Sequence, residues 1–423
     1  MNEKGIPARR SAIWLLDQVL GQGKLLSELI ATGGLDRLAA EDRARAQRLA
    51  TDVLRHLSRC DKLIDRHVQK SPQPHVRNVL RLGALELAQG AAAHGVVNDL
   101  VTIISRDKRH GRLRSLVNAV LRKIAAEAPE VWPILAPPKL PKWLRSPLVQ
   151  AWGAPAVKAM EVAQAAGAPV DLTVRVATDE VAAALNGTVL PTGSIRLADA
   201  GQISALPGYS DGAWWVQDAA AALPARILAP AKGAKVLDLC SAPGGKTLQL
   251  AAMVAEVTSV DISENRVQRL RENLARTGLA ADVQVQDALT LQGQWDAILL
   301  DAPCSATGTM RRHPDLPHAK DGSEFGALIA LQSELIDHAW TLLKPGGRMV
   351  FCTCSLLPDE GEVQVEDALA RHKDMQIDIE ALRIPGVDAE WITPEGGLRL
   401  RPDYWPEHGG MDGFFIGVLH KLA

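Results

Sequence analysis

The sequence predicts an all-α N-terminal domain, then a small α+β connector, then an α/β domain built on a parallel sheet. Three observations predict this fold class. Apolar residues recur every three or four positions over residues 8–126, the period of helices with one buried face. Prolines crowd residues 129–153 and interrupt that pattern. From residue 213 onward, short apolar runs alternate with amphipathic helical stretches, which is typical of a parallel sheet covered by helices.

Length and composition limit the classes of protein that fit. The chain has 423 residues, of which 47% are hydrophobic and 23% charged, so we expect a globular protein with two or three domains. It contains no run of about 20 apolar residues, and its first residues lack the apolar core of a secretory signal. We therefore expect a cytoplasmic protein with no membrane contact. The formal net charge is -2, so any nucleic-acid surface must be a local patch.

The N-terminal domain is predicted over residues 1–128. Helical periodicity is clearest in residues 9–20, 41–68, 74–90, 95–107 and 112–129. Gly90 and Pro129 are plausible helix stops. These stretches predict a helical bundle.

The connector is predicted over residues 129–212. Its proline-rich first part reads as a linker. A helix is then expected over residues 154–167, followed by strand-like pieces at 170–176 and 194–199.

The α/β domain is predicted over residues 213–423. Strands are expected at 234–240, 257–263, 282–288, 295–303 and 347–355, and an antiparallel-type strand at 412–422. Helices are expected at 245–254, 264–279 and 327–347. Ligands of such sheets bind beyond the carboxyl ends of the strands. The residues at those ends therefore carry the functional argument.

Polar groups follow four of the predicted strands. The first strand leads into a glycine-containing turn, whose backbone can approach a ligand at a helix N-terminus. This loop is made of Cys240, Ser241, Ala242, Pro243, Gly244, Gly245 and Lys246. Asp261 ends the second strand, where an acid can bind ribose hydroxyls; Asp287 ends the third, where it can meet an adenine amino group; Asp301 ends the fourth. Each acid could instead be a helix N-cap. The loop lacks the P-loop pattern, so a nucleoside without a phosphate chain, such as S-adenosylmethionine, is favoured.

The cysteines are few and odd in number, at positions 60, 240, 304, 352 and 354, which indicates free thiols in a reducing compartment. Cys304 and Cys354 follow predicted strands. A buried, inert thiol is the commoner role of a free cysteine, and we expect it for Cys60, Cys240 and Cys352. The C-x-C pair at 352–354 has no second pair of ligands nearby, so no metal site is expected.

Several motifs resemble those of the RNA cytosine-5 methyltransferases. They are "LDLCSAPGGKT" (237–247), "DAPCSATGT" (301–309), "RRHPD" (311–315), "TCSLLPDEGE" (353–362) and "DGFFIGVL" (412–419). The helical part resembles the NusB-like RNA-binding domain, with "VVND" (96–99) and "LVNAVLRK" (116–123) where its motifs fall. The combination is similar to the bacterial 16S rRNA cytosine-5 methyltransferases of the Sun/Fmu (RsmB) type, which carry a Rossmann-like domain.

The resemblance implies a reaction and roles for three residues. It implies S-adenosylmethionine as cofactor and RNA as partner, most of all 16S rRNA, naked or partly assembled, with the enzyme a monomer. Cys354 would add to carbon 6 of cytosine, so that carbon 5 becomes nucleophilic. Cys304 would assist release of the product, and Asp301 would hold the edge of the base. The motif spacing does not decide which cysteine attacks.

Two basic stretches are candidates for RNA contact. The first holds Arg106, Lys108, Arg109, Arg112 and Arg114, and the second holds Arg311 and Arg312. A charge run is usually a solvated face, but on a chain of nearly zero net charge these are the best phosphate-contacting candidates. The family's pattern usually continues "RRHPD" with Ile-Lys-Trp, whereas this chain has "LPHAKD" (316–321). The target base must leave its stack to reach the thiol.

Other functions remain open at this point. The same chemistry could act on another rRNA site or on tRNA. A non-catalytic RNA-binding assembly factor is a third interpretation, and the presence of Cys304, Cys354 and Asp301 argues against it. A DNA cytosine methyltransferase is disfavoured, because that group has its nucleophile in the "PC" motif and lacks the "TCS" motif.

Overall fold

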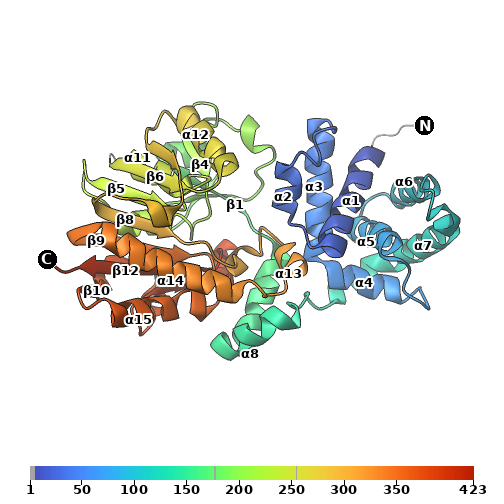
Figure 1. The fold of residues 1–423 in the computed structure, drawn as a ribbon. Coiled ribbons are helices and arrows are strands. Elements are labelled where there is room, and N and C mark those ends of the chain that lie inside the picture. Colours follow the sequence, from blue (N-terminus) through green and yellow to red (C-terminus); the bar gives the residue numbers. More distant parts are fainter. Residues whose placement is uncertain (1–4, 176–177, 254) are drawn as a thin grey trace. The chain divides into compact units, whose positions relative to one another are not determined.

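The computed structural model describes residues 5–175, 178–253 and 255–423. They form two compact units (Figure 1). The helical unit comprises Met1–Gly167 and Met310–Asp321, and the sheet unit comprises Ala168–Thr309 and Gly322–Ala423. Residues 1–4 and the predicted strand and helix ends at residues 176 and 254 lie outside the described part. In the part that is described, every helix is too short or too polar to cross a membrane.

The helical unit is a bundle around a core of Leu, Val and Ile. Its helices are α1 (Ile6–Gln22), α2 (Leu26–Ala31), α3 (Ala40–Arg55), α4 (Leu57–Asp65), α5 (Pro74–Ala88), α6 (Ala93–Ser105), α7 (Arg114–Val131) and α8 (Lys142–Ala166). α5 is central and packs against α1, α4, α6 and α7. Gly83 makes this packing close, because a Cβ there would lie 2.5 Å from a methyl of Leu121. The predicted helix 41–68 is two helices, since the backbone turns at His56 (φ -111°).

The predicted proline-rich linker is mostly helical, and this part of the prediction was wrong. α7 continues through Pro129 to Val131, and α8 contains Pro147 and Pro155. A proline removes one backbone donor, and the apolar face of α8 stays buried through residues such as Leu144 and Leu148. α8 changes direction at Gly153, where φ is 78°. The first segment of the helical unit therefore runs to Gly167 and includes α8.

Residues 310–321 belong to the helical unit although they follow the "DAPCSATGT" motif. Asp315 accepts a hydrogen bond from the Leu26 amide at 2.8 Å. The guanidinium of Arg55 donates to the carbonyl of Arg311 at 2.5 Å. The His318 ring lies 3.2 Å from the carbonyl of Leu54. The short helix α13 (Leu316–Ala319) is thus bonded to the helices at both of its ends.

The sheet unit is built on a sheet of order β10-β12-β9-β8-β5-β6-β7, with β11 beside β12. The bounds are β5 (Lys235–Leu239), β6 (Glu256–Asp261), β7 (Asp282–Val285), β8 (Trp295–Asp301), β9 (Leu343–Thr353), β10 (Met375–Ile377), β11 (Leu398–Leu400) and β12 (Phe414–Lys421). β5 to β9 are parallel, and β12 runs antiparallel to β9. This confirms the predicted sheet and its antiparallel last strand.

Alternating side chains along the strands pack into two hydrophobic cores, one on each face of the sheet. Leu237 and Phe351 pack on one face, where α14 (Phe325–Leu342) and α15 (Glu362–Arg371) lie (Figure 1). Val236 and Val350 pack on the other face with α10 (Leu223–Leu228). The remaining helices are α11 (Gly245–Ala252), after β5, and α12 (Glu264–Thr277), after β6.

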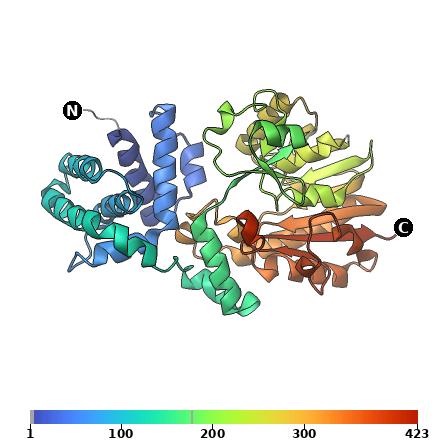
Figure 2. The same cartoon turned by 180° about the vertical axis from the view of Figure 1, so that it is seen from behind.

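A smaller antiparallel sheet precedes the large one, drawn in green in Figure 2. Its order is β2-β3-β1-β4, with β1 (Val170–Val174), β2 (Thr188–Val189), β3 (Ile195–Leu197), β4 (Trp214–Val216) and the helix α9 (Thr178–Ala184) beside them. The bidentate pair of Arg196 with Asp171, 2.7 Å for each bond, holds β3 to β1.

Removing Arg9 should destabilise the helical unit strongly. Its guanidinium is buried and donates to both oxygens of Glu86, at 2.6 and 2.7 Å, and to Asp99 at 2.6 Å. Arg9→Met leaves these carboxylates without that partner, so we expect a loss of about 3–5 kcal/mol in chemical denaturation followed by circular dichroism. Arg10 is exposed, and Arg10→Met is the matched control, expected within about 0.5 kcal/mol of wild type. Equal effects of the two variants would contradict the view that the buried ion pairs of Arg9 stabilise the helical unit.

Candidate active site

The pairing of β8 with β9 brings two catalytic candidates together. The strands run parallel with Asp301 opposite Cys352, and the Ala302 amide donates to the carbonyl of Cys352 at 3.0 Å. Both strands therefore end at the same edge of the sheet. Cys304 follows β8 by three residues, and Cys354 follows β9 directly.

The two thiols lie in direct contact. The sulfur of Cys304 is 3.5 Å from the sulfur of Cys354, and both residues are half-buried. The hydrogen bond to Cys354, followed by burial, raises the pKa of the Cys304 thiol well above its usual range, and the negative charge of Glu360 adds to this effect. Cys304 therefore keeps its proton and can donate it in a hydrogen bond to Cys354. Burial raises the pKa of Cys60 and Cys240 to about 12 each, which makes both poor nucleophiles.

Asp301 is held by two side chains that sequence reasoning did not connect to it. Nζ of Lys246 donates to its Oδ2 at 2.7 Å, and the Cys352 thiol lies 3.5 Å from Oδ1. Burial is the largest single effect and lowers the pKa of Lys246, but the charges of Asp301, Cys352 and Asp238 and the hydrogen bond to Asp301 together outweigh it, so the pKa is raised overall. Burial, and then the charge of Asp301, raises the pKa of Cys352 well above its usual range. Lys246 therefore stays charged, and Cys352 is a buried core residue that also contacts the acid.

The glycine loop is folded back onto Asp261. The amide of Ala242 donates to Oδ2 of Asp261 at 3.1 Å, and the amide of Ser263 donates to Oδ1 at 2.9 Å. Gly244 begins α11 with φ 104°, and a Cβ there would lie 2.2 Å from a methyl of Leu270. A side chain at this position would separate α11 from α12. Oδ2 of Asp261 thus supports the glycine loop, and Oδ1 supports the start of α12.

Asp287 and Ile262 occupy the neighbouring strand ends. Asp287 is exposed, and its Oδ1 accepts the Leu289 amide at 3.0 Å as the N-cap of a short helix. This is the capping role that the sequence left open for the acid. Ile262, which sequence reasoning missed, exposes 71% of its surface next to Asp261. A single exposed apolar side chain is common on protein surfaces, so Ile262 is a candidate ligand contact only through its place beside Asp261.

Comparison with known proteins places the chain in a family. Residues 6–126 match the NusB family, and residues 225–420 match the family described as 16S rRNA methyltransferase RsmB/F. A Klebsiella pneumoniae relative named Ribosomal RNA small subunit methyltransferase B is 34% identical, with 98% of each chain covered. The chain belongs to the RsmB/F family of rRNA methyltransferases. A relative of the same name from Pasteurella multocida is 32% identical over 99% of this chain and 97% of its own.

Solved structures share the fold of this RsmB/F-family chain. The crystal structure of PH0851 has a TM-score of 0.73 at 22% identity, with 100% of this chain and 99% of the other covered. NSun6 from Pyrococcus horikoshii, determined with SFG, has a TM-score of 0.58 at 20% identity and covers 67% of this chain and 98% of its own. The predicted fold class, a helical NusB-like region followed by an α/β methyltransferase domain, is confirmed.

The basic candidates for RNA contact fall into two groups. Arg106, Lys108, Arg109, Arg112 and Arg114 are all exposed on the helical unit. Arg311 is fully buried, and its guanidinium donates to the carbonyl of Gly167 at 3.2 and 3.4 Å. The expectation that Arg311 contacts RNA was therefore wrong, because a charge run in a sequence does not reveal which members are buried. Arg312 is half-buried and stays a prediction.

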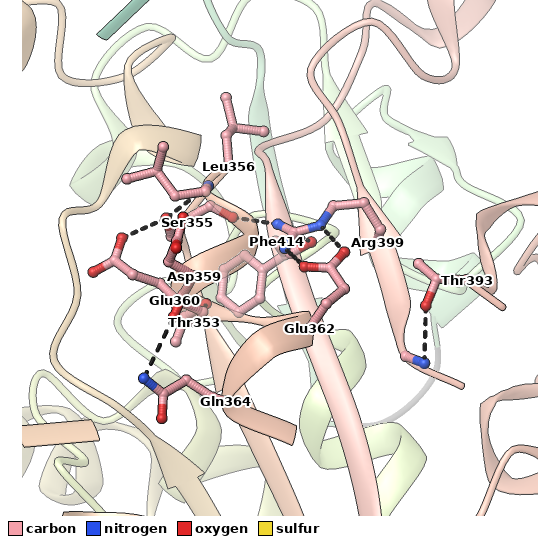
Figure 3. A network of polar contacts seen from close by, with 12 residues as sticks. Thr353, Ser355, Leu356, Asp359, Glu360, Glu362, Gln364, Thr393, Arg399 and Phe414 are labelled. Carbon is pink, nitrogen blue, oxygen red and sulfur yellow. Dashed lines mark hydrogen bonds and ion pairs between the residues drawn. The ribbon is translucent and has the colours of Figure 1, made fainter. Parts of the chain in front are cut away.

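Arg399 is a further residue of the site that the sequence did not reveal. It is 2% exposed on β11, and its guanidinium donates to Glu362 at 2.5 and 3.0 Å and to the carbonyl of Ser355 at 2.5 Å (Figure 3). Burying this ion pair is favourable only because its hydrogen bonds are satisfied. Arg399 therefore fixes the backbone that follows Cys354. An isolated arginine on a short strand gives no sequence signal of such a partner.

Asp238 should make stability depend on pH. It is fully buried under the glycine loop, where Thr247 donates to its Oδ2 at 2.6 Å, and burial raises its pKa to about 7. The unfolded carboxyl ionises near pH 4, so between about pH 4 and 7 the native state binds more protons and stability falls as pH rises. The total fall is at most about 4 kcal/mol.

Asp238→Asn should remove this slope. Its stability relative to wild type should rise between pH 5 and pH 8 in urea unfolding, whatever constant cost the amide adds. Asp211 is exposed, so Asp211→Asn is the control and should run parallel to wild type. A constant difference between Asp238→Asn and wild type would show that Asp238 is ionised throughout.

Proposed function

We propose that this rRNA methyltransferase transfers the methyl group of S-adenosylmethionine to carbon 5 of a cytosine in 16S rRNA through a covalent enzyme–RNA intermediate. The observation that carries the proposal is the contact of two thiols at the ends of β8 and β9, 3.5 Å apart, in a chain of an rRNA methyltransferase family. Carbon 5 of cytosine is a weak nucleophile, and reversible addition of a thiolate to carbon 6 activates it.

Cys354 is the nucleophile in this proposal. Its sulfur adds to carbon 6 and forms the carbon–sulfur bond, which leaves electron density on carbon 5. The resemblance of the "TCS" stretch (353–355) to the family's motif assigns this role. Cys304, whose pKa is raised, can donate a hydrogen bond that stabilises a thiolate at Cys354.

Cys304 is the acid–base group of the release step. After methylation, carbon 5 must lose its proton and the bond from carbon 6 to the Cys354 sulfur must break. Cys304 is in contact with that sulfur. To act as the base it must first give up its own proton to solvent; its thiolate can then take the proton from carbon 5 while the carbon–sulfur bond breaks and returns its electron pair to the Cys354 sulfur.

Asp301 and Lys246 orient the base. The carboxylate of Asp301 is partly exposed and is fixed by Lys246 from behind at 2.7 Å. A fixed carboxylate can accept hydrogen bonds from the protonated ring nitrogen or amino group of the adduct. The positive charge of Lys246 also lowers the free-energy cost of keeping Asp301 ionised next to the buried Cys352 thiol.

S-adenosylmethionine supplies an electrophilic methyl group to this site. The residues present fit such a ligand: the loop from Cys240 to Lys246 carries no phosphate-gripping pattern, Asp261 keeps unused lone pairs, and Ile262 exposes an apolar surface. Asp261 would bind the ribose hydroxyls and Asp287 the adenine amino group. The NSun6 relative of this fold was determined with SFG, an analogue of S-adenosylmethionine, which supports this use of the fold.

The RNA partner is proposed from the NusB-like helical unit and its exposed basic residues. Arg106, Arg109 and Arg112 lie in one exposed stretch between α6 and α7, where they can neutralise phosphates. The relatives named for the ribosomal small subunit favour 16S rRNA, naked or partly assembled, as substrate of a monomeric enzyme. Bisulfite sequencing of rRNA from a deletion strain should show one cytosine that loses its protection, and tRNA should be unchanged.

Asp261→Ala should weaken cofactor binding. The variant loses the carboxylate for the ribose and the acceptor of the Ala242 and Ser263 amides, so we expect a cost of about 2–4 kcal/mol, about 30- to 800-fold in Kd. Glu264, exposed at the start of α12 with its carboxylate on Arg271, gives the control Glu264→Ala. Calorimetric titration with S-adenosylmethionine measures both. An unchanged affinity for Asp261→Ala would show that the acid is structural.

The two cysteine variants should fail differently. Cys354→Ala removes the nucleophile, so neither a covalent adduct nor methylation should appear. Cys304→Ala should still attack but should stall before release, so that protein joined to RNA accumulates on denaturing gels and disappears with RNase. An adduct with Cys354→Ala and none with Cys304→Ala would reverse the roles. Full turnover by both variants would exclude covalent catalysis and leave the thiols as packing residues.

A further inference from the structure

A buried glutamate lies between the loops that carry the two thiols. Glu360 ends a short helix, Pro358–Glu360, six residues after Cys354, and its side chain is 0% exposed. Figure 3 shows it beside Ser355 and Leu356. Neither cysteine is hydrogen-bonded to it. Its bonds go to the residues that follow each cysteine in the chain.

The carboxylate of Glu360 bridges Ser305 and Ser355. Its Oε2 accepts the hydroxyls of Ser305 and Ser355, each at 2.5 Å. Its Oε1 accepts the amide of Ser305 at 2.9 Å and the side-chain amide of Gln332 at 3.1 Å. Ser305 is next to Cys304 and Ser355 is next to Cys354. One carboxylate thus bonds to the residue next to each thiol, and the two serine hydroxyls also lie 3.3 Å from each other.

The surroundings of Glu360 hold it in place from three elements. The carbonyl of Glu360 accepts the Thr353 hydroxyl at 2.7 Å (Figure 3). Gln332 on α14 donates to the carbonyl of Pro303, next to Cys304, at 2.8 Å. Arg399 donates to the carbonyl of Ser355 at 2.5 Å. The carboxylate is therefore one member of a connected network around the thiols.

Burying a carboxylate costs desolvation free energy. The hydrogen-bond donors that offset this cost for Glu360 are neutral groups. All four hydrogen bonds recorded for its oxygens come from hydroxyls and amides. An apolar side chain could fill the same space at lower cost. It could not bond to Ser305 and Ser355 at once, and this difference points to a role in geometry rather than in stability.

We propose that Glu360 is a positioning residue, which sets the contact between Cys304 and Cys354 by binding both of their loops through Ser305 and Ser355. The proposal rests on the proposed function of the thiol pair for its catalytic meaning, but the contact itself can be measured without RNA. Glu360→Ala removes the bridge. Glu360→Gln keeps it, because the amide can accept from Ser305 and Gln332 with its oxygen and donate to the serine hydroxyls with its nitrogen.

Thiol cross-linking tests the geometry directly. Dibromobimane joins two nearby thiols by two thioether bonds and releases two bromide ions, and mass spectrometry identifies the peptide pair that holds Cys304 and Cys354. We expect the rate of this cross-link to fall at least tenfold in Glu360→Ala and to stay within about twofold of wild type in Glu360→Gln. Glu366 is exposed on α15, and Glu366→Ala is the matched control, expected to behave as wild type. Wild-type cross-linking in Glu360→Ala would overturn the proposal.

Calorimetry and kinetics separate this role from folding and from the proposed chemistry. Glu360→Ala should bind S-adenosylmethionine as wild type does and lose kcat with little change in KM for RNA, and Glu360→Gln should recover most of the loss. If Glu360→Ala does not fold, Ser355→Ala decides. It removes the hydroxyl that bonds to the Glu360 carboxylate, together with that hydroxyl's contacts to Ser305, Thr307 and the Leu357 amide, and leaves the other three bonds of the carboxylate in place. Unchanged cross-linking in Ser355→Ala would then refute the role. Failure of methylation in wild type together with the predicted cross-linking would refute the cytosine chemistry and leave the positioning role intact.

Discussion

The chemistry proposed for this chain depends on the parallel pairing of β8 with β9. Asp301 and Cys352 face each other at the end of that pair, so the loops that follow the two strands start at one edge of the sheet. The strands lie in the middle of the sheet, between β5 and β12, and their side chains feed cores on both faces. A slip of one residue in this register would turn every buried side chain to the wrong face. The cores therefore fix the register, and the register fixes which residues meet at the edge.

Charged groups buried at that edge make the site rigid. Arg399 and Glu362 form a buried ion pair, Lys246 is buried against the partly exposed Asp301, and Glu360 is buried among neutral donors. Each of these groups would cost several kcal/mol without its partners, so the network is stable only when every member is bonded. A covalent mechanism benefits from this stiffness, because displacements of about 1 Å at the reacting atoms can cost about a hundredfold in rate.

The sequence predicted the elements and the strand-end residues better than the contacts between them. Cys304, Cys354 and Asp301 could be named because short motifs and strand periodicity mark them. The partners Lys246 and Asp301 are 55 residues apart, and nothing in either local pattern links them. Glu360 reads as one acid in a polar run, yet it is fully buried. Tertiary packing decides which polar residues are buried, so Arg311 was predicted to be a surface cation although it is buried. Tertiary packing also keeps the proline-rich stretch helical, although its sequence predicts a linker.

Three distant motifs meet at the loop that carries Cys304. The Gly308 amide donates to the carbonyl of Cys354 at 2.9 Å, and the Gly413 amide donates to the carbonyl of Gly308 at 2.9 Å. A Cβ on Gly308 would lie 2.0 Å from the Gly413 carbonyl oxygen, so only glycine lets these backbones approach. Residues 310–321, which follow this loop, belong to the helical unit. Within the sheet unit, chain continuity therefore holds the loop only at its N-terminal end, where it leaves β8. The bonds through Gly308, Ser305 and Glu360 hold this loop a second time within the sheet unit. Residues of "TCSLLPDEGE" and "DGFFIGVL" thus support a loop whose thiol lies in neither motif.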